Sequence, residues 1–385
     1  MKTAIIGAGA SGLICAIIAS RLGKNVVLFE RQDSCAKKLN TTGNGRCNLT
    51  NEKIESHQYN NKEFVKKIFD IFGLDDTIKF FKSIGLELIL DKKPHRLYPK
   101  TLQAKTVSKL LSLEIKNLNI QLNYNTTITN ITKEKNMFLL ETSNNILYNF
   151  DKVVLSTGSM AHKLGATIGY EIASKLSHNI INTKASLVPL LSNNPLCVML
   201  SGIKIDTKTT MLIDDKPKHI VCGDLLFTNY GLSGLAILEQ SRFLRQYNTQ
   251  DISIVVDIFH EFSEYELINY LKHRAKIFQN KTNKELLLGL VHEKFISIVS
   301  HNDNLSTIAK KLKNIEFKII GTRGFKYGEV CSGGVDIKEI DTNTLQSKKV
   351  KNLYFCGELL DIDANCGGFN LQFAWSSGAI VAQSL

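Results

Sequence analysis

The sequence of 385 residues contains no apolar run long enough to cross a membrane. Its most apolar stretch near the start, Leu13 to Ala19, is far shorter than the ~20 residues that a spanning helix requires. The first predicted strand begins at Lys2, which leaves no length for a signal peptide before it. We therefore expect a cytoplasmic protein that makes no membrane contact.

The chain also lacks any Cys-x-x-Cys pair, although it has eight cysteines. Zinc knuckles and dithiol redox motifs both require such close pairs, so neither is predicted and no metal site is expected. Scattered thiols that stay reduced are typical of a cytoplasmic protein. The eight are Cys15, Cys35, Cys47, Cys197, Cys222, Cys331, Cys356 and Cys366.

Internal repeats, low-complexity linkers and a second Gly-x-Gly-x-x-Gly motif are absent from the sequence as well. A hydrophobic fraction of 43% and a charged fraction of 22% are ordinary for a globular protein. The length predicts two or three domains with enough core to be stable without disulfides. The oligomeric state stays open.

The net charge of +12, from 48 basic and 36 acidic residues, has two interpretations. It is compatible with a polyanionic partner such as ribosomal RNA. Compositional drift toward Lys, Asn and Ile is favoured, because no single basic block dominates the chain. The densest basic stretch contains Lys92, Lys93, His95, Arg96, Lys100 and Lys105.

A complete dinucleotide-binding fingerprint lies at the start of the chain. An apolar strand over residues 2–6 runs directly into Gly7, Gly9 and Gly12, and a helix opens there. In this motif Gly7 permits the tight turn, Gly9 lets the backbone approach a pyrophosphate, and Gly12 lets the helix pack close to the strand. The free N–H groups at the helix start then attract the phosphates.

A second strand, Val26 to Phe29, completes the fingerprint by ending on Glu30. We expect Glu30 to accept hydrogen bonds from an adenosine ribose, which disfavours a 2′-phosphate at that position. An unrelated glycine turn is the less favoured interpretation, because strand, helix, second strand and acid are all in place.

Two later apolar runs have the character of buried parallel strands that return to the same sheet. One begins at Asp151 and ends on Thr157 and Gly158, which suit close passage of an adenosine arm. The other ends on Gly357 and Glu358, and Glu358 is expected to accept the hydroxyl protons of a ribityl chain.

The last predicted helix begins near Phe369, directly after Gly367 and Gly368. Its positive end would stabilise negative charge at the N1/C2=O edge of a reduced flavin. A nicotinamide dinucleotide develops no comparable anion. FAD is therefore the predicted bound cofactor, with NAD(P)H as a transient electron donor.

Periodicity predicts the elements between these segments. After Leu187 the residue pattern changes to short segments of alternating apolar and polar residues, which indicates a small β-barrel. A helical pattern then follows over Glu264–Leu312. The predicted helices elsewhere are Phe64–Ile84, Thr106–Leu118 and Gly169–Leu176. A meander of antiparallel strands is predicted over Ile120–Leu122, Thr127–Ile131, Phe138–Thr142 and Ile146–Tyr148. The strands of the barrel are predicted at Leu187–Leu191, Ile203–Thr207, Thr210–Ile213, Ile220–Val221 and Ile252–Asp257.

Over nearly its whole length the sequence resembles the BaiN-type (also YhiN-type) NAD(P)/FAD-dependent oxidoreductases. The motifs that carry the resemblance are Gly7–Gly12, Thr42–Asn48, Arg96–Pro99 with Ala104, Gly223–Thr228, Tyr230–Gly234, Ser332–Val335, Gly357–Asp361, Cys366–Gln372 and Ala374–Gly378.

The resemblance implies an α/β fold with a Rossmann-like, glutathione-reductase-type FAD domain and an inserted β-barrel plus helical-bundle module. The insertion agrees with the change in residue pattern after residue 187. The FAD domain is predicted over 1–186 and 322–385, the barrel over 187–260 and 314–321, and the helical domain over 261–313.

Three positions depart from the family pattern. Asn229 replaces a histidine, which removes one titratable candidate from the insert, and Leu235 replaces a proline. Asn44 replaces a glycine, and the turn is expected to survive because Asn tolerates positive φ.

Two cysteines are candidates for redox or acid–base chemistry. Cys47 lies where related disulfide reductases carry a redox pair, but Thr42 and Glu52 occupy the positions five residues away, so disulfide exchange is not expected. A small buried thiol is the default interpretation for Cys47. Cys366 is a candidate catalytic general acid, with local packing as the alternative.

The predicted cofactor-binding residues lie in five segments. Arg46 among them is expected to offset a phosphate or flavin charge, or to cap a nearby carbonyl. The full set is Gly7, Gly9, Ala10, Ser11, Gly12, Glu30, Arg31, Lys38, Gly45, Arg46, Cys47, Thr157, Gly158, Gly357, Glu358, Asp361, Gly367, Gly368, Phe369 and Asn370.

The predicted function is hydride transfer from NAD(P)H through flavin to an activated C=C acceptor. The resemblance implies acceptors as different as steroid-like enones, an aminoketone and a uridine in ribosomal RNA. The net charge and the basic stretch Lys92–Lys105 would suit the uridine, with basic surface ordering phosphates around a flipped base. The alternatives are a small-molecule amine or ketone oxidase and a non-catalytic flavin-bearing module that binds RNA or protein.

Overall fold

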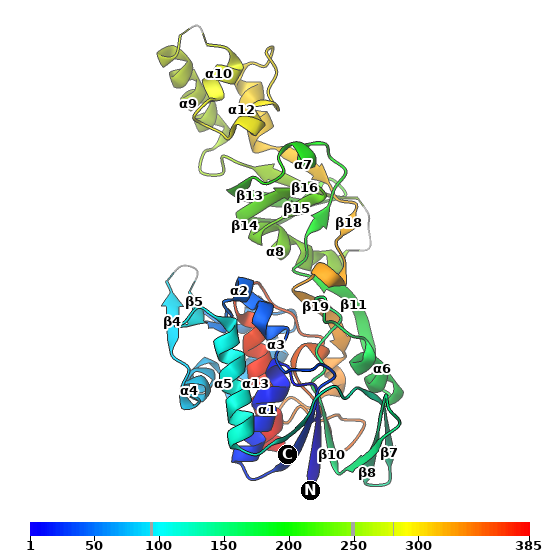
Figure 1. The fold of residues 1–385 in the computed structure, drawn as a ribbon. Helices are drawn as coiled ribbons and strands as arrows, with labels where there is room; N and C mark the ends of the chain where they lie inside the picture. Colours follow the sequence, from blue (N-terminus) through cyan, green and yellow to red (C-terminus); the bar gives the residue numbers. More distant parts are fainter. Residues whose placement is uncertain (93–94, 248–250, 280) are drawn as a thin grey trace. The chain divides into compact units, whose positions relative to one another are not determined.

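The computed structural model describes every residue except 93–94, 248–250 and 280, so Lys93 of the predicted basic stretch lies outside the described residues. Two compact units are present, and each is described by itself (Figure 1). The first contains Met1–Ser186 and Glu329–Leu385, and the second contains Leu187–Gly328.

A five-stranded parallel sheet lies at the centre of the first unit. The three central strands are mostly buried and rich in Val and Ile, as expected for a parallel sheet covered on both faces. Their order is β20 (Leu353–Phe355), β10 (Lys152–Leu155), β1 (Lys2–Ile6), β2 (Asn25–Phe29) and β6 (Gln121–Asn123). The predicted return of two late strands to this sheet is therefore confirmed.

The strand predicted at Ile120–Leu122 is not part of the antiparallel meander. It is β6, which pairs in parallel with β2 after the crossover helix α5 (Ala104–Asn117). A three-residue strand is too short for its alternation to reveal its partner, so the sequence prediction was wrong. The remaining meander consists of β7 (Ile128–Glu134), β8 (Met137–Thr142) and β9 (Leu147–Phe150).

Helices α1 (Ala10–Arg21), α5 and α13 (Phe369–Ser384) lie side by side on one side of the sheet (Figure 1). A Cβ on Gly378 of α13 would overlap the Ser11 carbonyl oxygen, so this glycine allows α13 to pack directly on α1. Arg21 joins α1 to α5 through an ion pair of 2.8 Å with Glu114. Within the described residues, no helix has the length and apolarity needed to span a membrane.

The predicted helix Phe64–Ile84 is two helices, α3 (Lys62–Ile71) and α4 (Leu74–Ser83). Gly73 interrupts it, and its N–H donates to Asp76 Oδ2 at 3.0 Å, so that α4 begins with its own N-terminal cap. Both helices keep the apolar spacing that predicted a single one. The remaining elements of this unit are α2 (Thr42–Gly45), β3 (Thr50–Asn51), β4 (Leu88–Asp91), β5 (Arg96–Pro99), α6 (Ile168–Lys175), β11 (Ile180–Ser186) and β19 (Val330–Val335).

A seven-stranded sheet and a separate helical cluster make up the second unit. The segments predicted as two strands around Thr207 and Thr210 form one strand, β13 (Lys204–Ile213), whose pairing with the next strand shifts register between Met211 and Leu212. The barrel and its boundaries stay a prediction. The sheet order is β17 (Ile315–Lys318), β16 (Ile252–Asp257), β13 (Lys204–Ile213), β14 (Lys216–Thr228), β15 (Gly231–Ser233), β12 (Leu190–Leu191) and β18 (Gly321–Thr322). The helices are α7 (Leu196–Met199), α8 (Leu235–Phe243), α9 (Glu264–Ile277), α10 (Asn283–Leu287), α11 (Glu293–Ile296) and α12 (Leu305–Lys313).

Candidate functional site

Three adjacent parallel strands end at one edge of the first unit's sheet. Ile6 at the end of β1 is level with Leu155 at the end of β10, and Leu155 is level with Phe355 at the end of β20. The predicted binding segments that follow these strands therefore lie next to one another. Because β2 lies on the other side of β1, this edge is a topological switch point, where open α/β sheets bind ligands.

The glycine loop after β1 has a different geometry at each glycine. Gly7 has φ +105°, and a Cβ there would lie 2.6 Å from the Ser156 carbonyl oxygen. A Cβ on Gly12 would overlap the Gly7 carbonyl oxygen, so only glycine allows α1 to start this close to the strand. At Gly9 no described atom lies within 4 Å of the position that a Cβ would occupy, which leaves this side of the loop open.

Glu30 is fixed by two backbone donors at the end of β2. Its Oε2 accepts the Ala8 N–H at 2.8 Å and its Oε1 accepts the Gln32 N–H at 2.9 Å. The carboxylate therefore lies beside the glycine loop with capacity for further donors. The Arg31 guanidinium points to another segment and donates to the Leu164 carbonyl oxygen.

The end of β10 combines a packed hydroxyl with an open glycine. Thr157 Oγ1 is buried, has no hydrogen-bond partner among the described residues, and packs on Gly169 of α6. Gly158 follows at φ +73°, and a Cβ added to it would meet no described atom within 4 Å. The passage of an adenosine arm along this open side of Gly158 stays a prediction.

The end of β20 is held by contacts to both long helices. Gly357 has φ +71°, and a Cβ there would lie only 2.4 Å from Ser11 Oγ. The Gly357 N–H donates to Ser377 Oγ at 2.9 Å. Glu358 Oε2 pairs with Lys38 Nζ at 2.6 Å, which links two segments that sequence reasoning selected separately.

Cys331 on β19 and Tyr170 on α6 are neighbours of Glu358 that sequence reasoning missed. Glu358 Oε1 accepts the Cys331 N–H at 2.9 Å. Burial, and then the Glu358 charge, raise the pKa of Cys331 to about 12, and burial also raises the pKa of the Tyr170 hydroxyl. Both groups therefore stay neutral. The sequence signal that could have found Cys331 is the family motif Ser332–Val335, which directly follows it. In the structure this motif contacts a predicted site residue, because the Gly333 N–H donates to Asp361 Oδ1 at 3.0 Å.

The second glycine loop adopts the left-handed conformation predicted for it. Gly43 has φ +57° and Asn44 has φ +54°, so the asparagine substitution preserves the turn. Arg46 Nε donates to the Gly43 carbonyl oxygen at 3.3 Å, and its guanidinium lies 5.3 Å from the centre of the Tyr98 ring. Arg46 thus caps a carbonyl, one of the two roles considered for it.

Cys47 is fully buried beside this loop. Burial raises the pKa of its thiol to about 12, and a hydrogen bond with Thr42 offsets the shift only in part. A thiol in this state is protonated at neutral pH and is a poor nucleophile. All eight cysteines lie among the described residues, and they form no disulfide.

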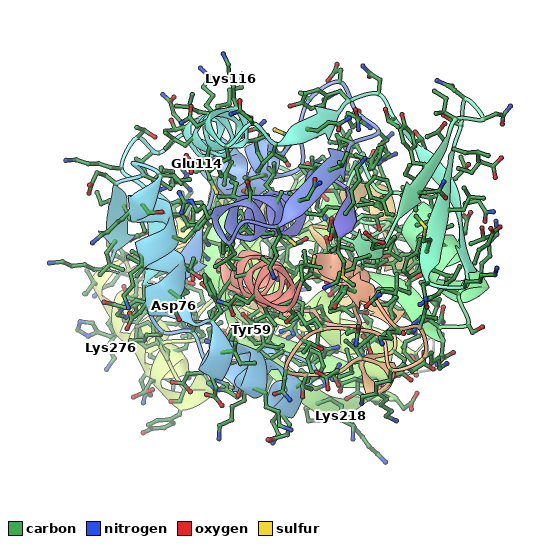
Figure 2. All side chains as sticks on the ribbon, turned by 90° about the horizontal axis from the view of Figure 1, so that it is seen from below. Tyr59, Asp76, Glu114, Lys116, Lys218 and Lys276 are labelled. Carbon is green, nitrogen blue, oxygen red and sulfur yellow. The ribbon has the colours of Figure 1, made fainter. Side chains whose placement is uncertain are left out.

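The start of α13 depends on two glycines. Gly368 has φ +96°, and a Cβ there would lie 2.6 Å from the Thr50 carbonyl. Tyr59 lies beside α13 (Figure 2) and donates its hydroxyl to the Phe369 carbonyl oxygen at 2.7 Å. Asn370 Oδ1 accepts the Ala364 N–H at 2.9 Å, which fixes the preceding loop, and Cys366 on that loop is half-buried.

This edge of the sheet fits a dinucleotide cofactor. Helices α1 and α13 both have a glycine N-cap, no capping side chain and no acid in the first turn. Their first N–H groups lack intrahelical partners and favour negative charge. Gly9, Gly45 and Gly158 all leave open space where a ligand would approach the backbone. Among the described residues, no group of three or more His, Cys, Asp or Glu could hold a metal ion.

Residues 1–384 match the family described as the HI0933-like protein Rossmann domain. The chain belongs to this family. It is 29% identical to the 3-dehydro-bile acid delta(4,6)-reductase of Clostridium scindens, with 100% of this chain and 98% of that protein aligned. It is 30% identical to a ribosomal RNA dihydrouridine synthase of Haemophilus influenzae (99% and 97% covered) and 28% identical to one of Escherichia coli (99% and 97%).

These relatives confirm the resemblance to the BaiN- and YhiN-type proteins, and the HI0933-like chain is a flavin-dependent oxidoreductase. The solved structure of 3-ketosteroid-delta4-(5alpha)-dehydrogenase from Rhodococcus jostii, in complex with 4-androstene-3,17-dione, superposes with a TM-score of 0.52. It covers 99% of this chain and 96% of that chain at 11% identity, which is a likeness of fold.

Proposed function

We propose that this HI0933-like protein binds FAD at the carboxyl edge of its parallel sheet and reduces a C=C bond conjugated to a carbonyl. The observation that carries the proposal is the pair of uncapped helix N-termini on α1 and α13. One suits the pyrophosphate, and the other suits an anionic edge of the reduced ring.

The offset between the two helices supports this assignment. Gly378 of α13 packs on Ser11 in the first turn of α1, whereas α13 itself begins at Phe369. Gly378 lies nine positions after Phe369 on the helix, which at 1.5 Å per position corresponds to about 13 Å. An offset of this size suits a cofactor whose phosphates and redox-active ring are joined by an extended ribityl chain.

Acidic side chains would orient the sugar parts of FAD. Glu30, already fixed by Ala8 and Gln32, would accept hydrogen bonds from the adenosine ribose. Glu358, held by Lys38, would accept from the ribityl hydroxyls. Both carboxylates are oriented before ligand binding, so little side-chain entropy is lost when the cofactor binds.

Bound flavin supplies a hydride, received from NAD(P)H in this proposal. Saturation of a C=C bond needs that hydride on one carbon and a proton on the other. Cys366 is the candidate proton donor, because it is half-buried on the loop that precedes Gly367 and Gly368.

A Cys366→Ser protein should bind FAD normally and pass electrons to acceptor at least tenfold more slowly. Wild-type reoxidation by acceptor in this variant would assign Cys366 to packing.

A uridine in ribosomal RNA is the acceptor that we favour. Two relatives are named as ribosomal RNA dihydrouridine synthases, and the net charge of +12 suits a polyanionic substrate. The relative named as a bile acid reductase supports a second candidate, a steroid-like enone. Both acceptors have a C=C bond conjugated to a carbonyl, which accepts charge as the hydride adds.

The absorbance spectrum of the purified protein, followed by anaerobic titration with NADPH and NADH, tests the proposal. We expect a flavin spectrum that bleaches, and then recovers on addition of an RNA or enone acceptor. Loss of dihydrouridine from ribosomal RNA in a deletion strain would support the uridine. Peroxide formation with amines would support an oxidase, and a flavin that no nicotinamide bleaches would support a non-catalytic binding module. A colourless protein that cannot be reconstituted with FAD would refute the proposal.

A further inference from the structure

A groove of about 560 Å³ lies in the first unit, between β7, the end of α6 and the segment before β20. Its volume is in the range of ligand-binding clefts. Four of its ten lining residues are lysines and none is acidic. The lining consists of Asn130, Ile131, Thr132, Lys133, Lys175, Leu176, Ser177, Lys349, Val350 and Lys351.

Neighbouring groups restrain two of these ammonium groups without neutralising them. Lys133 Nζ donates to the Lys351 carbonyl oxygen and lies 4.8 Å from the centre of the Phe138 ring. Burial and the nearby Lys351 charge lower the pKa of Lys133. Lys175 Nζ donates to Asn130 Oδ1 at 3.3 Å. Positive charges held this close together favour an anionic ligand, because it relieves their mutual repulsion.

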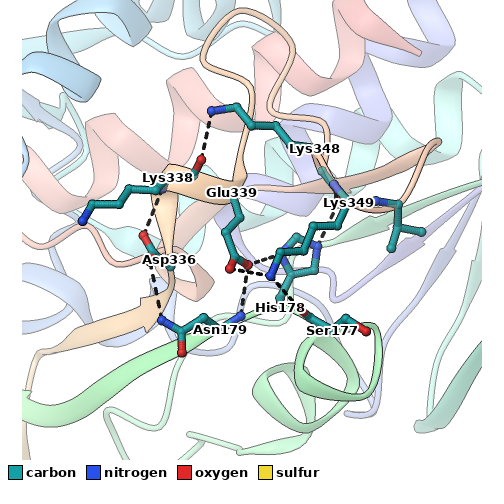
Figure 3. Close-up of polar contacts among 10 residues, drawn as sticks. Ser177, His178, Asn179, Asp336, Lys338, Glu339, Lys348 and Lys349 are labelled. Atoms are coloured by element: carbon teal, nitrogen blue, oxygen red, sulfur yellow. Dashed lines mark hydrogen bonds and ion pairs between the residues drawn. The ribbon is translucent and has the colours of Figure 1, made fainter.

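A hydrogen-bond network that extends to the buried His178 fixes the third lysine (Figure 3). Lys349 Nζ donates to Glu339 Oε1 at 2.5 Å and to the Ser177 carbonyl oxygen at 2.7 Å. Glu339 is itself held by His178 Nδ1 at 3.0 Å and by the Asn179 N–H at 3.0 Å. The network therefore orients Lys349 at the wall of the groove, and the ion pair with Glu339 offsets the charge of this lysine.

The same network contains a serine–histidine–glutamate series, which requires a separate interpretation. Because Glu339 only accepts, His178 Nδ1 donates to it, and His178 Nε2 accepts the Ser347 hydroxyl at 2.8 Å. Ser347 is 4% exposed and His178 is 3% exposed, so a substrate has no access to either. The series positions Lys349 and does not form a hydrolytic site.

Lysines continue from the groove along the amino edge of the parallel sheet. Lys351 precedes β20, Lys152 begins β10, Lys2 begins β1 and Lys24 precedes β2. Neighbouring strands lie about 4.8 Å apart, so these four form a row across four adjacent strands. Asp151 is the acid within this row, where its carboxylate accepts the Lys2 backbone N–H.

We propose that this groove, with the lysine row that continues from it, binds the phosphate backbone of RNA. A row of charges across several strands suits an extended polyanion, whereas a compact anion would need convergent donors. The inference rests on the proposed uridine substrate. The groove lies at the opposite end of the strands from the glycine loop, so it would anchor RNA remote from the reacting base.

A Lys175→Glu/Lys351→Glu double variant tests this inference. Both side chains are exposed, and neither belongs to the network around His178. The matched control is Lys109→Glu/Lys116→Glu on α5, which makes the same charge change away from the groove (Lys116 is labelled in Figure 2). The probe is a fluorescent single-stranded oligouridylate, titrated at several salt concentrations. We expect the groove variant to bind at least tenfold more weakly, with a salt slope shallower by about 1.4.

Two further measurements identify the source of the phosphates and separate this inference from the catalytic proposal. If inorganic pyrophosphate at equal phosphate concentration competes as well as the oligouridylate, the site is for small anions and the RNA assignment is wrong. Equal affinities for the groove and control variants would also overturn it. NADPH bleaching of the flavin should be unchanged in both variants. A wild-type flavin that never bleaches would refute the proposed reaction while the binding comparison still decides the groove.

Discussion

The two ends of the parallel sheet in the first unit present opposite chemistry. At the carboxyl edge, backbone amides, glycines and the fixed acids Glu30 and Glu358 make the candidate flavin site. At the amino edge, long lysine side chains form a groove and a row. One edge has a shape defined by close backbone packing, and the other has a concentration of charge.

The difference predicts how each edge responds to substitution. A site made from packed backbone fails when one atom is added, because neither the strand nor the helix can move. A site made from several flexible cations loses affinity in steps, since each charge contributes additively to long-range attraction. Single changes should therefore be severe at the carboxyl edge and mild at the amino edge.

Gly12→Val should produce the largest effect, because its side chain would overlap the Gly7 carbonyl oxygen. We expect little soluble protein and no flavin absorbance. Gly9→Ala is the matched variant, since Gly9 has φ −82° and open space at the Cβ position. It should fold with a circular dichroism spectrum like that of the wild type, and bind FAD more weakly. Normal folding of both variants would contradict the packing argument.

Glu30→Ala should have the next largest effect, because it removes the carboxylate proposed to accept from the adenosine ribose, which the Ala8 and Gln32 N–H groups hold in place. Charge-assisted hydrogen bonds contribute about 1.5–3 kcal/mol, so FAD affinity should fall about 10- to 100-fold. Fluorescence titration of the apoprotein with FAD measures this change. Glu30→Gln keeps one of the two acceptor oxygens and should lie between wild type and alanine. An unchanged Kd in Glu30→Ala would remove the ribose contact from the proposal.

Short-range patterns made the carboxyl edge predictable from sequence. The fingerprint needs only residues close in the chain, and Asn44 adopts positive φ because its own side chain tolerates it. The Lys38–Glu358 pair and the role of Gly378 against α1 were not predictable, because both depend on residues hundreds of positions apart. The parallel pairing of β6 with β2 was missed for a different reason, because a three-residue strand is too short for its pattern to reveal its partner.

The lysine row at the amino edge could not be predicted from the sequence. Lys2, Lys24, Lys152 and Lys351 are isolated in the sequence and become neighbours only through the strand order. The sequence instead indicated the stretch from Lys92 to Lys105 as the most basic segment, because its charges lie close together in the chain. A charged surface assembled from separate strand starts requires the topology before it can be recognised.

Cys47→Ala should have a small effect that separates packing from chemistry. The thiol has a pKa of about 12 because of burial, so it is protonated at neutral pH. We expect a loss of stability of about 1 kcal/mol from the lost packing and less than a twofold change in turnover. Iodoacetamide should label the exposed Cys222 and spare Cys47 in the folded protein, as peptide mass spectrometry would show. Rapid labelling of Cys47, or a large loss of turnover, would give this thiol a chemical role.

His178→Asn should give the smallest effect on activity, and the diagnostic readout is a change in the pH dependence of its stability. Burial lowers the pKa of His178 below its ordinary value of 6.5, against the opposing effect of Glu339. The unfolded chain therefore binds more protons than the folded protein once the pH falls below about 6.5, and stability is lost as the pH decreases toward the folded pKa. Above that range both states are neutral and the contribution is constant. Thermal unfolding between pH 7.5 and 5 should show a smaller decrease of Tm in the variant than in the wild type. If Tm falls equally with pH in the variant and the wild type, His178 accepts a proton in the folded protein as readily as in the unfolded chain. Lys349 would then have a positively charged neighbour instead of a neutral one.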